Sequence, residues 1–554
     1  MAGLAASFGS GSMTNSIGEI PYADVLFLLG ANPTDAHPII GLHMRAALRR
    51  GAKFIVADPR KIWFAERADY FLQLRPGTDC MLLNAMMNVI ISEGLENKEF
   101  INARTENYEV LKEYCKDITP ERAEKIIGVP AEHIRKAARL YATADKAAIF
   151  YTLGITEHVC GTETVRTIAN LAMLTGHIGK PSSGVNPLRG QNNVQGASDM
   201  GTMPDRFHGY QFVDDQAARE RFEKAWGVKL PTTKGLMSPE MFDAANNGRL
   251  KAMMVMGEDP VMSQPNQEHI INGLKRLEFI VAIDIFMNET SKYAHVILPA
   301  ASCAEKDGTF TNSERRVQRV RKAVEPIGTS RADWQILCEL ATRMGYQMKY
   351  NHPSEVWDEL AVLASKFFGG INYERIDRVG IQWPCPDKNH PGTQYLHKDT
   401  FSRGRGLFYS PPCRPPAEKT DSEFPLILST GRTLYQYNAG TMSRRSSGCS
   451  QIESECFVEI SPFDAEMNGI KDGDMVRVIS RRGEVQARAK VVGIKEGVIW
   501  MPMHFAEAAA NRLTVSAYDN ITMTPEYKVC AAKVEKDGEK KSKKKTATAT
   551  TGIA

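Results

Sequence analysis

The chain has 554 residues, of which 43% are hydrophobic and 24% are charged, and its formal net charge at pH 7 is +4. This is the composition of a globular protein of about three or four domains, and so small a net charge argues against nucleic acid as a partner. No apolar run is long enough to span a membrane. The ten scattered cysteines contain no Cys-x-x-Cys motif, which argues against zinc or iron–sulfur sites and favours a cytoplasmic location.

The first part of the chain predicts strands that alternate with helices. Residues 25–30 form a continuous apolar run that predicts a buried strand, and a helix over 38–50 and a strand over 53–57 follow. Residues 147–153 and 162–175 repeat the order of strand and helix. Alternation of this kind predicts an open parallel sheet with crossover helices.

Two segments of the chain share a pattern of strand ends. Gly30 ends one predicted strand and Asp58 follows the next, 28 residues later, whereas 27 residues separate Gly257 from Asp284 in the second segment. Ligands of parallel sheets bind beyond the carboxyl ends of the strands, where an acid accepts hydrogen bonds from a ribose or a base. The matched spacing predicts two nucleotide-like ligands. A turn role for each Asp is the alternative, and the lack of Gly-x-Gly-x-x-Gly in both segments disfavours an ordinary NAD site.

The last third of the chain changes character. Residues 384–416 are rich in Pro, Gly, Cys and charge and predict a linker or a long surface excursion. Short apolar strands with tight turns follow and predict a compact β-barrel of about 120 residues. We therefore expect two α/β domains, a barrel and a disordered Lys/Thr/Ala tail, with the boundaries 1–190, 191–412, 413–536 and 537–554.

The segment 186–196 is rich in Gly, Asn and Gln and contains one arginine, Arg189. Amide groups and a permanently charged, planar guanidinium suit a large polar ligand and a small carboxylate held side by side. A solvated loop is the alternative, although the apolar flanks of the segment argue against it.

Six longer motifs carry a family resemblance: NPLRGQNNVQGASDMG (186–201), MGEDP (256–260), EKDGTFTNSERRVQ (305–318), DWQI (333–336), STGRTLYQYNAGTMSRRS (429–446) and NRLT…TPEYKVCA (511–531). With these motifs the chain resembles the molybdopterin-guanine-dinucleotide oxidoreductases of the DMSO reductase family, and it is most similar to catalytic (alpha) subunits of selenocysteine-type formate dehydrogenases. The resemblance extends to about residue 535. It implies two Rossmann-like parallel-sheet domains related by an internal repeat, and a six-stranded barrel of the double-psi type.

The resemblance also implies a cofactor and a set of site residues. The cofactor would be molybdenum or tungsten held by two molybdopterin guanine dinucleotides, and Arg189 would orient formate beside the metal. One dinucleotide would lie on the first α/β domain, the other on the second, and further residues would line the central cleft or cover the pterins from the barrel. The residues expected at the first dinucleotide are Asn32, Asp35, Asp58, Arg60, Gly77 and Asp79, and those at the second are Glu258, Asp259, Asp284 and Asp333. The cleft would be lined by Gly154, Glu157 and Gln191, and the pterins would be covered by Arg432, Gln436, His504, Asn511 and Lys528.

Purely structural roles remain open for single members of this set. A capping or turn role is the alternative for each acid, and a surface ion pair is the alternative for Lys528. We interpret His158, which follows Glu157, as pocket lining or core.

The sequence departs from the family at its start. Where the family has Val-Ala-Gly-Leu, the chain reads Met1-Ala-Gly-Leu4, and the metal-ligating Cys or selenocysteine of the family would lie about five residues upstream by the family's spacing. No metal ligand is therefore expected within the chain, and the family's [4Fe–4S] cluster would lie on a preceding segment. We expect the 554-residue polypeptide alone not to oxidise formate, and expect iron–sulfur or flavin subunits as electron-transfer partners.

Four questions stay open at this point. A nitrate-reductase-like enzyme and a non-catalytic subunit that keeps the cofactor fold are the alternatives in function. The choice between molybdenum and tungsten, the electron acceptor and the physiological direction do not follow from the residues.

Overall fold

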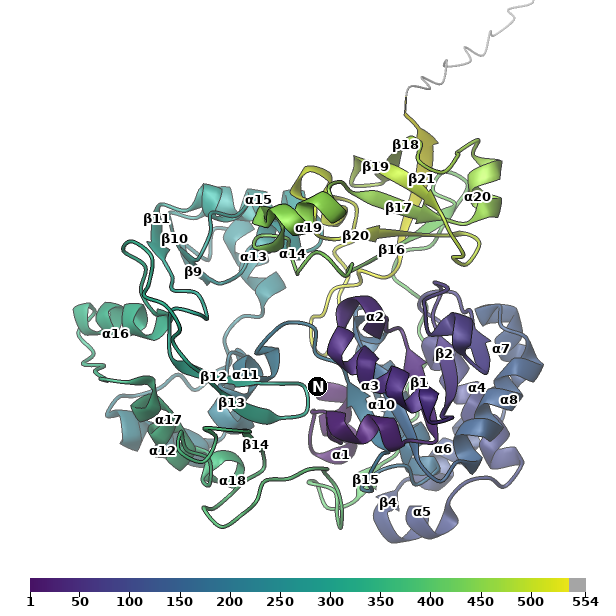
Figure 1. The fold of residues 1–554 in the computed structure, drawn as a ribbon, viewed down its shortest axis with the longest axis horizontal. Coiled ribbons are helices and arrows are strands. Elements are labelled where there is room, and N and C mark those ends of the chain that lie inside the picture. Colours follow the sequence, from purple (N-terminus) through teal and green to yellow (C-terminus); the bar gives the residue numbers. More distant parts are fainter. Residues whose placement is uncertain (538–554) are drawn as a thin grey trace, which may run out of the picture.

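The computed structural model describes residues 1–537, so the expected Lys/Thr/Ala tail lies outside the described residues. The described chain forms three lobes (Figure 1). A first α/β lobe lies at the lower right of the view, a second at the left, and a barrel at the upper right, above the first lobe. Within residues 1–537, no helix combines the length and the apolar character needed to cross a membrane.

The first lobe is built on a five-stranded sheet whose strands are all parallel. In sheet order its strands are β3 (Tyr70–Leu72), β2 (Lys53–Ala57), β1 (Val25–Leu29), β5 (Ala147–Tyr151) and β6 (Gly184–Pro187). The predicted parallel sheet is confirmed, and its helices α3 (Pro38–Arg49) and α10 (Gly161–Leu174) lie within one or two residues of the expected bounds.

The central strand β1 is buried along its whole length because both faces of the sheet are covered. Phe27 packs with helices α4 (Asp79–Ser92) and α8 (Ala131–Thr143) in one core, whereas its neighbour Leu28 packs with α3 in another. This lobe also contains α1 (Ala2–Phe8), α2 (Pro33–Ala36), α5 (Lys98–Arg104), β4 (Thr105–Glu106), α6 (Tyr108–Cys115), α7 (Pro120–Ile127) and α9 (Leu153–Thr156).

The second lobe repeats the parallel arrangement on a smaller scale. Its strands β11 (Val296–Pro299), β10 (Phe279–Asp284) and β9 (Ala252–Met256) run parallel in that order. Beside them lies the antiparallel sheet β12 (Gly308–Thr311), β13 (Arg316–Val320) and β14 (Ile381–Gln382). The remaining elements are α11 (Val194–Asp199), β7 (Arg206–Phe207), β8 (Gln211–Phe212), α12 (Gln216–Trp226), α13 (Ser238–Asn246), α14 (Pro260–Ser263), α15 (Gln267–Arg276), α16 (Asp333–Arg343), α17 (Pro353–Leu363) and α18 (Ser365–Phe368).

The segment 384–416 is more firmly packed than a linker. Phe401 and Phe408 are buried in the core of the first lobe, and β15 (Gly406–Leu407) pairs with β4 of that lobe. The composition of the segment did not reveal this, because two aromatic anchors suffice to fix a chain that is otherwise polar.

The third lobe is a closed six-stranded barrel, which confirms the predicted barrel. Around the barrel the strands are β16 (Leu426–Gly431), β20 (Val498–Pro502), β17 (Phe457–Ile460), β19 (Gly483–Val491), β18 (Met475–Ser480) and β21 (Cys530–Lys536). Helices α19 (Ser447–Ile452) and α20 (Pro462–Met467) lie in its connections. Short 3₁₀ helices elsewhere span Ile17–Tyr22, Ala65–Arg67, His208–Tyr210, Ser291–Tyr293, Ser443–Arg445, Ala506–Ala508 and Ala510–Arg512.

Candidate functional site

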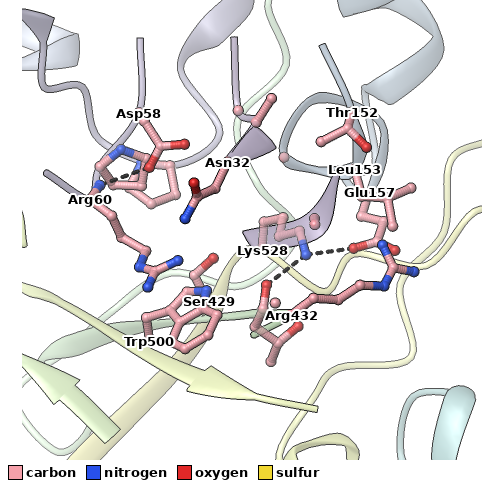
Figure 2. A pocket seen from close by; sticks show the side chains of 18 of the residues that line it. Asn32, Asp58, Arg60, Thr152, Leu153, Glu157, Ser429, Arg432, Trp500 and Lys528 are labelled. Carbon is pink, nitrogen blue, oxygen red and sulfur yellow. Dashed lines mark hydrogen bonds and ion pairs between the residues drawn. The ribbon is translucent and has the colours of Figure 1, made fainter. Parts of the chain in front are cut away.

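The carboxyl ends of β1, β2 and β5 face the barrel across a cavity, which we call the first cavity (Figure 2). At one side of the cavity, Arg60 forms an isolated β-bridge with Ile494 of the barrel, so that the two lobes close over the space. Eight predicted site residues line this cavity: Asn32, Asp58, Arg60, Asp79, Gly154, Glu157, Arg432 and Lys528.

The wall between β1 and β5 is bare backbone. Gly30 has φ +51°, and a Cβ there would lie 2.7 Å from the carbonyl carbon of Gly154. Two glycines are required because the loops after the two strands touch, and a ligand can therefore approach the backbone closely.

An ion pair joins two lobes across the first cavity. Lys528 of the barrel lies 2.6 Å from a carboxylate oxygen of Glu157, and its ammonium also donates to the carbonyl of Thr430 at 2.6 Å (Figure 2). Arg432 lies beside them, and burial lowers the pKa of its guanidinium while the Glu157 carboxylate opposes that change. This end of the first cavity thus gathers two cations against one buried acid, which favours an anionic part of a ligand here.

The far end of the first cavity holds two acids that burial keeps easy to protonate. Burial raises the pKa of Asp58 to about 7 and that of Asp79 to about 6. Asp58 accepts the backbone amide of Arg60 at 2.8 Å, while the Arg60 guanidinium donates twice to Glu459 at 2.7 Å and stacks 3.8 Å over the ring of Trp500. A carboxylate beside a stacked planar cation can accept hydrogen bonds from a base edge.

The loop after β1 keeps an acceptor free. The Asn32 side-chain amide donates to Asp35 at 2.7 Å, whereas its carbonyl oxygen is buried without a hydrogen-bond partner among the described residues. Burying an unpaired acceptor costs roughly 1–3 kcal/mol unless a ligand pairs with it. The first cavity therefore fits a large polar ligand that brings donors to Asn32.

A second cavity lies at the carboxyl ends of β9 and β10. It is lined by five predicted site residues, which are Gln191, Glu258, Asp259, Asp284 and Asp333. Residues 437–442 of the barrel lobe reach it from the other side. Each α/β lobe thus has one cavity at its strand ends, as the repeat predicts for two ligands.

The acids of the second cavity differ in how many of their carboxylate hydrogen bonds are already made to protein groups. Asp259 accepts the hydroxyl and amide of Thr290 at 2.6 and 3.0 Å, so its carboxylate holds the loop that follows β10. Burial raises the pKa of Asp284, which accepts the Ile285 amide and the Asn288 side chain. Asp333 forms an ion pair with Lys306, another lining residue.

Arg189 has unused donors in a buried position. Its Nε and Nη2 atoms are buried without hydrogen-bond partners within residues 1–537, while Ser313 accepts its backbone amide at 3.2 Å. The Met1 amino group lies nearby at the centre of the molecule (Figure 1); burial, aided by the Arg189 charge, lowers its pKa to about 5. A guanidinium with two free donors on one side suits a bidentate carboxylate.

Arg189 lines neither cavity, and the same holds for five of the predicted cofactor-binding residues. Asp35 is paired with Asn32, and Gly77 lies where a Cβ would meet Pro416 at 2.7 Å. Gln436, His504 and Asn511 are buried, and each is bound to neighbouring protein groups, namely Ser443 and Glu453, Thr433 and Asn438, and Met262 and Thr514.

The ring of His504 shows how protein contacts occupy such a residue. Its Nε2 accepts the amide of Thr433 at 3.0 Å and its other ring nitrogen bonds the carbonyl of Asn438. Burial lowers its pKa to about 4, so the ring is neutral and supports the loop rather than meeting a ligand directly.

Other lining residues were missed by sequence reasoning. Trp500 lies in an apolar strand run that gave no signal, whereas Thr430 stands inside the motif STGR and could have been chosen. Lys306 belongs to the motif at 305–318 and faces the second cavity. His158 lines the first cavity and bonds the Gly154 carbonyl at 2.9 Å, in line with its interpretation as pocket lining.

Comparison with family models identifies the family of the chain and its cofactor. A model described as molybdopterin oxidoreductase matches residues 4–343, and one described as a molybdopterin dinucleotide binding domain matches residues 426–531. The chain belongs to the molybdopterin oxidoreductase family. The family and the fold class expected from the sequence are confirmed. The cofactor is molybdenum with a molybdopterin dinucleotide.

Relatives agree over nearly the whole chain. The F420-dependent formate dehydrogenase subunit alpha of Methanocaldococcus jannaschii is 47% identical over 97% of this chain and 80% of the relative. Formate dehydrogenase H of Escherichia coli is 44% identical over 97% and 76%, and the assimilatory nitrate reductase catalytic subunit of Bacillus subtilis is 36% identical over 94% and 76%.

A solved structure shares the fold. Acetylene hydratase from Pelobacter acetylenicus superposes with a TM-score of 0.77 at 22% identity, covering 97% of this chain and 80% of that one. At this identity the likeness supports the architecture alone.

The residues of the two cavities fit the family's cofactor. Buried acids, an acceptor without a partner and two cations near the barrel match the guanine, ribose and phosphate groups of a dinucleotide. Among the described residues, no group of three or more His, Cys, Asp or Glu side chains could hold a metal ion.

Proposed function

We propose that the protein is the catalytic subunit of a formate dehydrogenase, which converts formate to CO₂ with release of two electrons, or catalyses the reverse reaction. The observation that carries this proposal is Arg189, whose buried Nε and Nη2 donors have no partner within the described chain. Formate is a small planar monoanion that such a guanidinium holds with two parallel hydrogen bonds. Relatives named formate dehydrogenases at 44–47% identity support the same substrate.

Each cavity would hold one molybdopterin guanine dinucleotide. Asp58 and Asp79 would meet the guanine or ribose in the first cavity, and Asp284 and Asp333 those in the second. An acid that accepts the N1 and N2 hydrogens of guanine discriminates against adenine. The domains 1–190 and 191–412 would each carry one dinucleotide, with 413–536 closing over both.

The chain's own residues would act by binding and positioning. Arg189 would fix the carboxylate of formate in one orientation, and Gln191, two residues on, would align the second dinucleotide. The bound cofactor supplies the two-electron acceptor that the oxidation needs. Lys528 and Arg432 would neutralise the charge of the ligand in the first cavity, and the buried setting strengthens each of these contacts.

The test is turnover by the cofactor-loaded enzyme expressed from the natural reading frame, including any coding DNA upstream of Met1, with formate and a viologen dye. We expect Arg189→Lys to lower kcat/KM for formate by at least about 100-fold, since a lysine cannot reproduce the bidentate fork. The control Arg122→Lys changes an exposed arginine on α7. Unchanged formate oxidation by Arg189→Lys would overturn the role of Arg189.

The same assay separates the alternatives. Reduction of nitrate by the loaded enzyme, without formate turnover, would favour the nitrate-reductase-like reading, and binding of the cofactor without either activity would favour a non-catalytic subunit. The 554-residue chain alone, assayed beside the natural frame, tests whether an upstream ligand is needed.

Partners and location belong to the proposal as well. Relatives named alpha subunits support further subunits, and we infer that iron–sulfur or flavin subunits in the cytoplasm take the electrons.

A further inference from the structure

Two cysteine thiols far apart in the sequence meet at the start of α4, next to Asp79, a lining residue of the first cavity. Cys80 and Cys413, separated by 333 residues, place their sulfur atoms 2.7 Å apart, and both are free thiols. A disulfide bond is about 2.05 Å long, so a small side-chain movement would bring the two sulfurs to bonding distance. Neither thiol has a part in the proposed formate chemistry.

The surroundings favour reaction at one thiol and resolution by the other. The buried Asn84 side chain donates to both sulfurs, at 3.4 Å to Cys80 and 3.2 Å to Cys413. The hydrogen bond between the two thiols, aided by Asn84, holds the pKa of Cys413 below its usual value, whereas that of Cys80 is raised. Cys413 is also half-buried while Cys80 is 3% exposed, so the more acidic thiol is the one that solvent reaches.

Both sulfurs lie in segments that the fold holds in place. Cys80 is the second residue of α4 and follows Asp79, which lines the first cavity. Tyr114 donates to the carbonyl of Pro411 at 2.6 Å, two residues before Cys413. The thiols are therefore kept together by their neighbours and do not meet by chance fluctuation of a loose loop.

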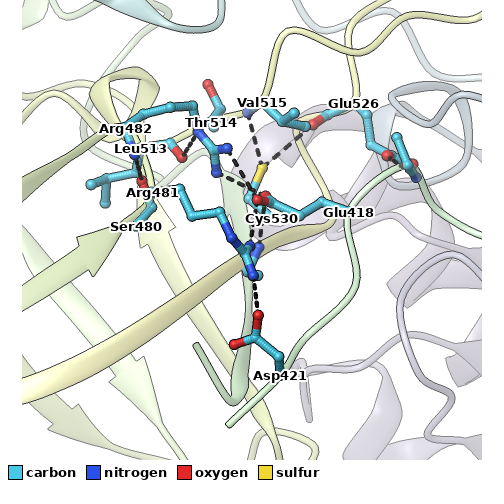
Figure 3. A network of polar contacts seen from close by, with 12 residues as sticks. Glu418, Asp421, Ser480, Arg481, Arg482, Leu513, Thr514, Val515, Glu526 and Cys530 are labelled. Atoms are coloured by element: carbon cyan, nitrogen blue, oxygen red, sulfur yellow. Dashed lines mark hydrogen bonds and ion pairs between the residues drawn. The ribbon is translucent and has the colours of Figure 1, made fainter. Parts of the chain in front are cut away.

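On its other side the segment of Cys413 is fastened to the barrel (Figure 3). Glu418 accepts Arg481 at 2.6 Å, Arg482 at 2.8 Å and the amide of Ala531 at 3.0 Å. A bond from Cys80 to Cys413 would thus tie α4 of the first lobe to the segment that Glu418 fastens to the strand ends of the barrel.

We propose that Cys80 and Cys413 form a reversible disulfide when the protein meets a peroxide, and that this bond locks the first lobe to the barrel segment. The Cys413 thiolate attacks one oxygen of hydrogen peroxide, giving a sulfenic acid and hydroxide. The Cys80 thiol then attacks that sulfur, the S–S bond forms and water leaves. Two thiols and one peroxide yield one disulfide and two waters, and a dithiol reductant reverses the step.

The experiment titrates the reduced full chain with hydrogen peroxide, blocks the remaining thiols with N-ethylmaleimide and maps peptides by mass spectrometry without reduction. We expect a cross-linked peptide pair containing Cys80 and Cys413 that dithiothreitol separates. Cys413→Ser should abolish it, and the control Cys303→Ser, which removes an exposed thiol outside the pair, should leave it intact. Thermal unfolding of the oxidised protein should shift upward by several degrees relative to the reduced protein, except in Cys413→Ser.

Two outcomes would overturn the proposal, and both can be read in the unmodified protein, independently of whether a variant folds. One is oxidation of Cys413 to sulfinic acid while Cys80 stays alkylatable. The other is pairing of Cys80 with a different cysteine, such as Cys115 or Cys160. Equal melting of the oxidised and reduced protein would overturn the locking of the two lobes.

Discussion

The amide of Gly257 donates a 2.9 Å hydrogen bond to the carbonyl of Ile283, the residue directly before Asp284. The first lobe contains the same bond, from Gly30 to Ala57 at 3.0 Å, directly before Asp58. The two glycines have positive φ of 63° and 51°, so the chain turns into the cavity at matching points. The repeat in spacing is therefore a repeat of backbone geometry, and it places one acid at the same position of each cavity.

Asp58 is the first acid to test. In the cofactor-free protein at pH 8, Asp58→Asn should weaken binding of GDP by roughly 10- to 150-fold, because hydrogen bonds to a charged group contribute about 1.5–3 kcal/mol. Calorimetry measures the loss, ADP serves as the adenine comparison, and Asp117→Asn is the exposed control. Equal GDP affinity in the two variants would rule out guanine recognition by Asp58.

Asp58 should contribute to the stability of the cofactor-free protein at pH 4, and this contribution should be lost as the pH rises to about 7. Burial raises the pKa of Asp58 to about 7, above the value of about 3.9 in an unfolded chain. The folded state thus binds the proton more tightly, and the stabilisation present below pH 4 is lost as the pH rises through 7. The change would amount to at most about 4 kcal/mol.

Urea unfolding at pH 4.5 and 7.5 measures this dependence on pH. Asp58→Asn, which cannot ionise, should lack the Asp58 contribution, so its free energy of unfolding at pH 7.5 relative to pH 4.5 should be higher than in the unmodified protein, whereas Asp117→Asn should match the unmodified protein. A profile that Asp58→Asn leaves unchanged would mean that Asp58 is already ionised in the folded protein at low pH.

Much of the site could be predicted because its signals are local. Gly30, Asp58 and Asp284 each stand at the end of an apolar run, and a strand end fixes where its next residue lies. Trp500 could not be found in this way, because only the closure of the barrel over the first lobe brings it to Arg60. His504 has a sequence signal, because it falls on a motif position, but its predicted contact with the cofactor is not seen. A motif marks a position and does not tell whether the side chain meets a ligand or the backbone of Thr433.

The packing of the segment 384–416 was missed for a related reason. Its prolines and charges outnumber Phe401 and Phe408, although these two side chains decide its course. Average composition over a window hides single anchors, so the path of such a segment follows only from long-range contacts.

The ion pair of Glu157 and Lys528 should contribute more to stability than surface pairs do. The two side chains are 14% and 11% exposed, so Lys528→Ala would strand a buried carboxylate and cost about 3–5 kcal/mol. The double variant Glu157→Gln with Lys528→Met should recover part of that loss. Chemical unfolding of the single and double variants measures the coupling.

The matched control is the pair Lys251 and Glu278, whose side chains are 70% and 68% exposed. Lys251→Ala should cost at most about 1 kcal/mol. Equal losses in Lys251→Ala and Lys528→Ala would show that solvent screens both pairs alike.

Arg315 should be needed for the two α/β lobes to hold together. Its fully buried guanidinium donates to the carbonyls of Met13, Trp383, Thr393 and Gln394, which belong to segments on both sides of the interface. Arg315→Ala leaves these acceptors unpaired, at about 1–3 kcal/mol each where water does not enter, so we expect a fall in melting temperature and faster proteolysis between the lobes. Arg315→Lys should recover only part of the loss, because an ammonium cannot reach several carbonyls in one plane. Differential scanning calorimetry compares the melting temperature of Arg315→Ala with that of the exposed control Arg49→Ala. If the two melting temperatures are equal, the four hydrogen bonds do not hold the lobes together.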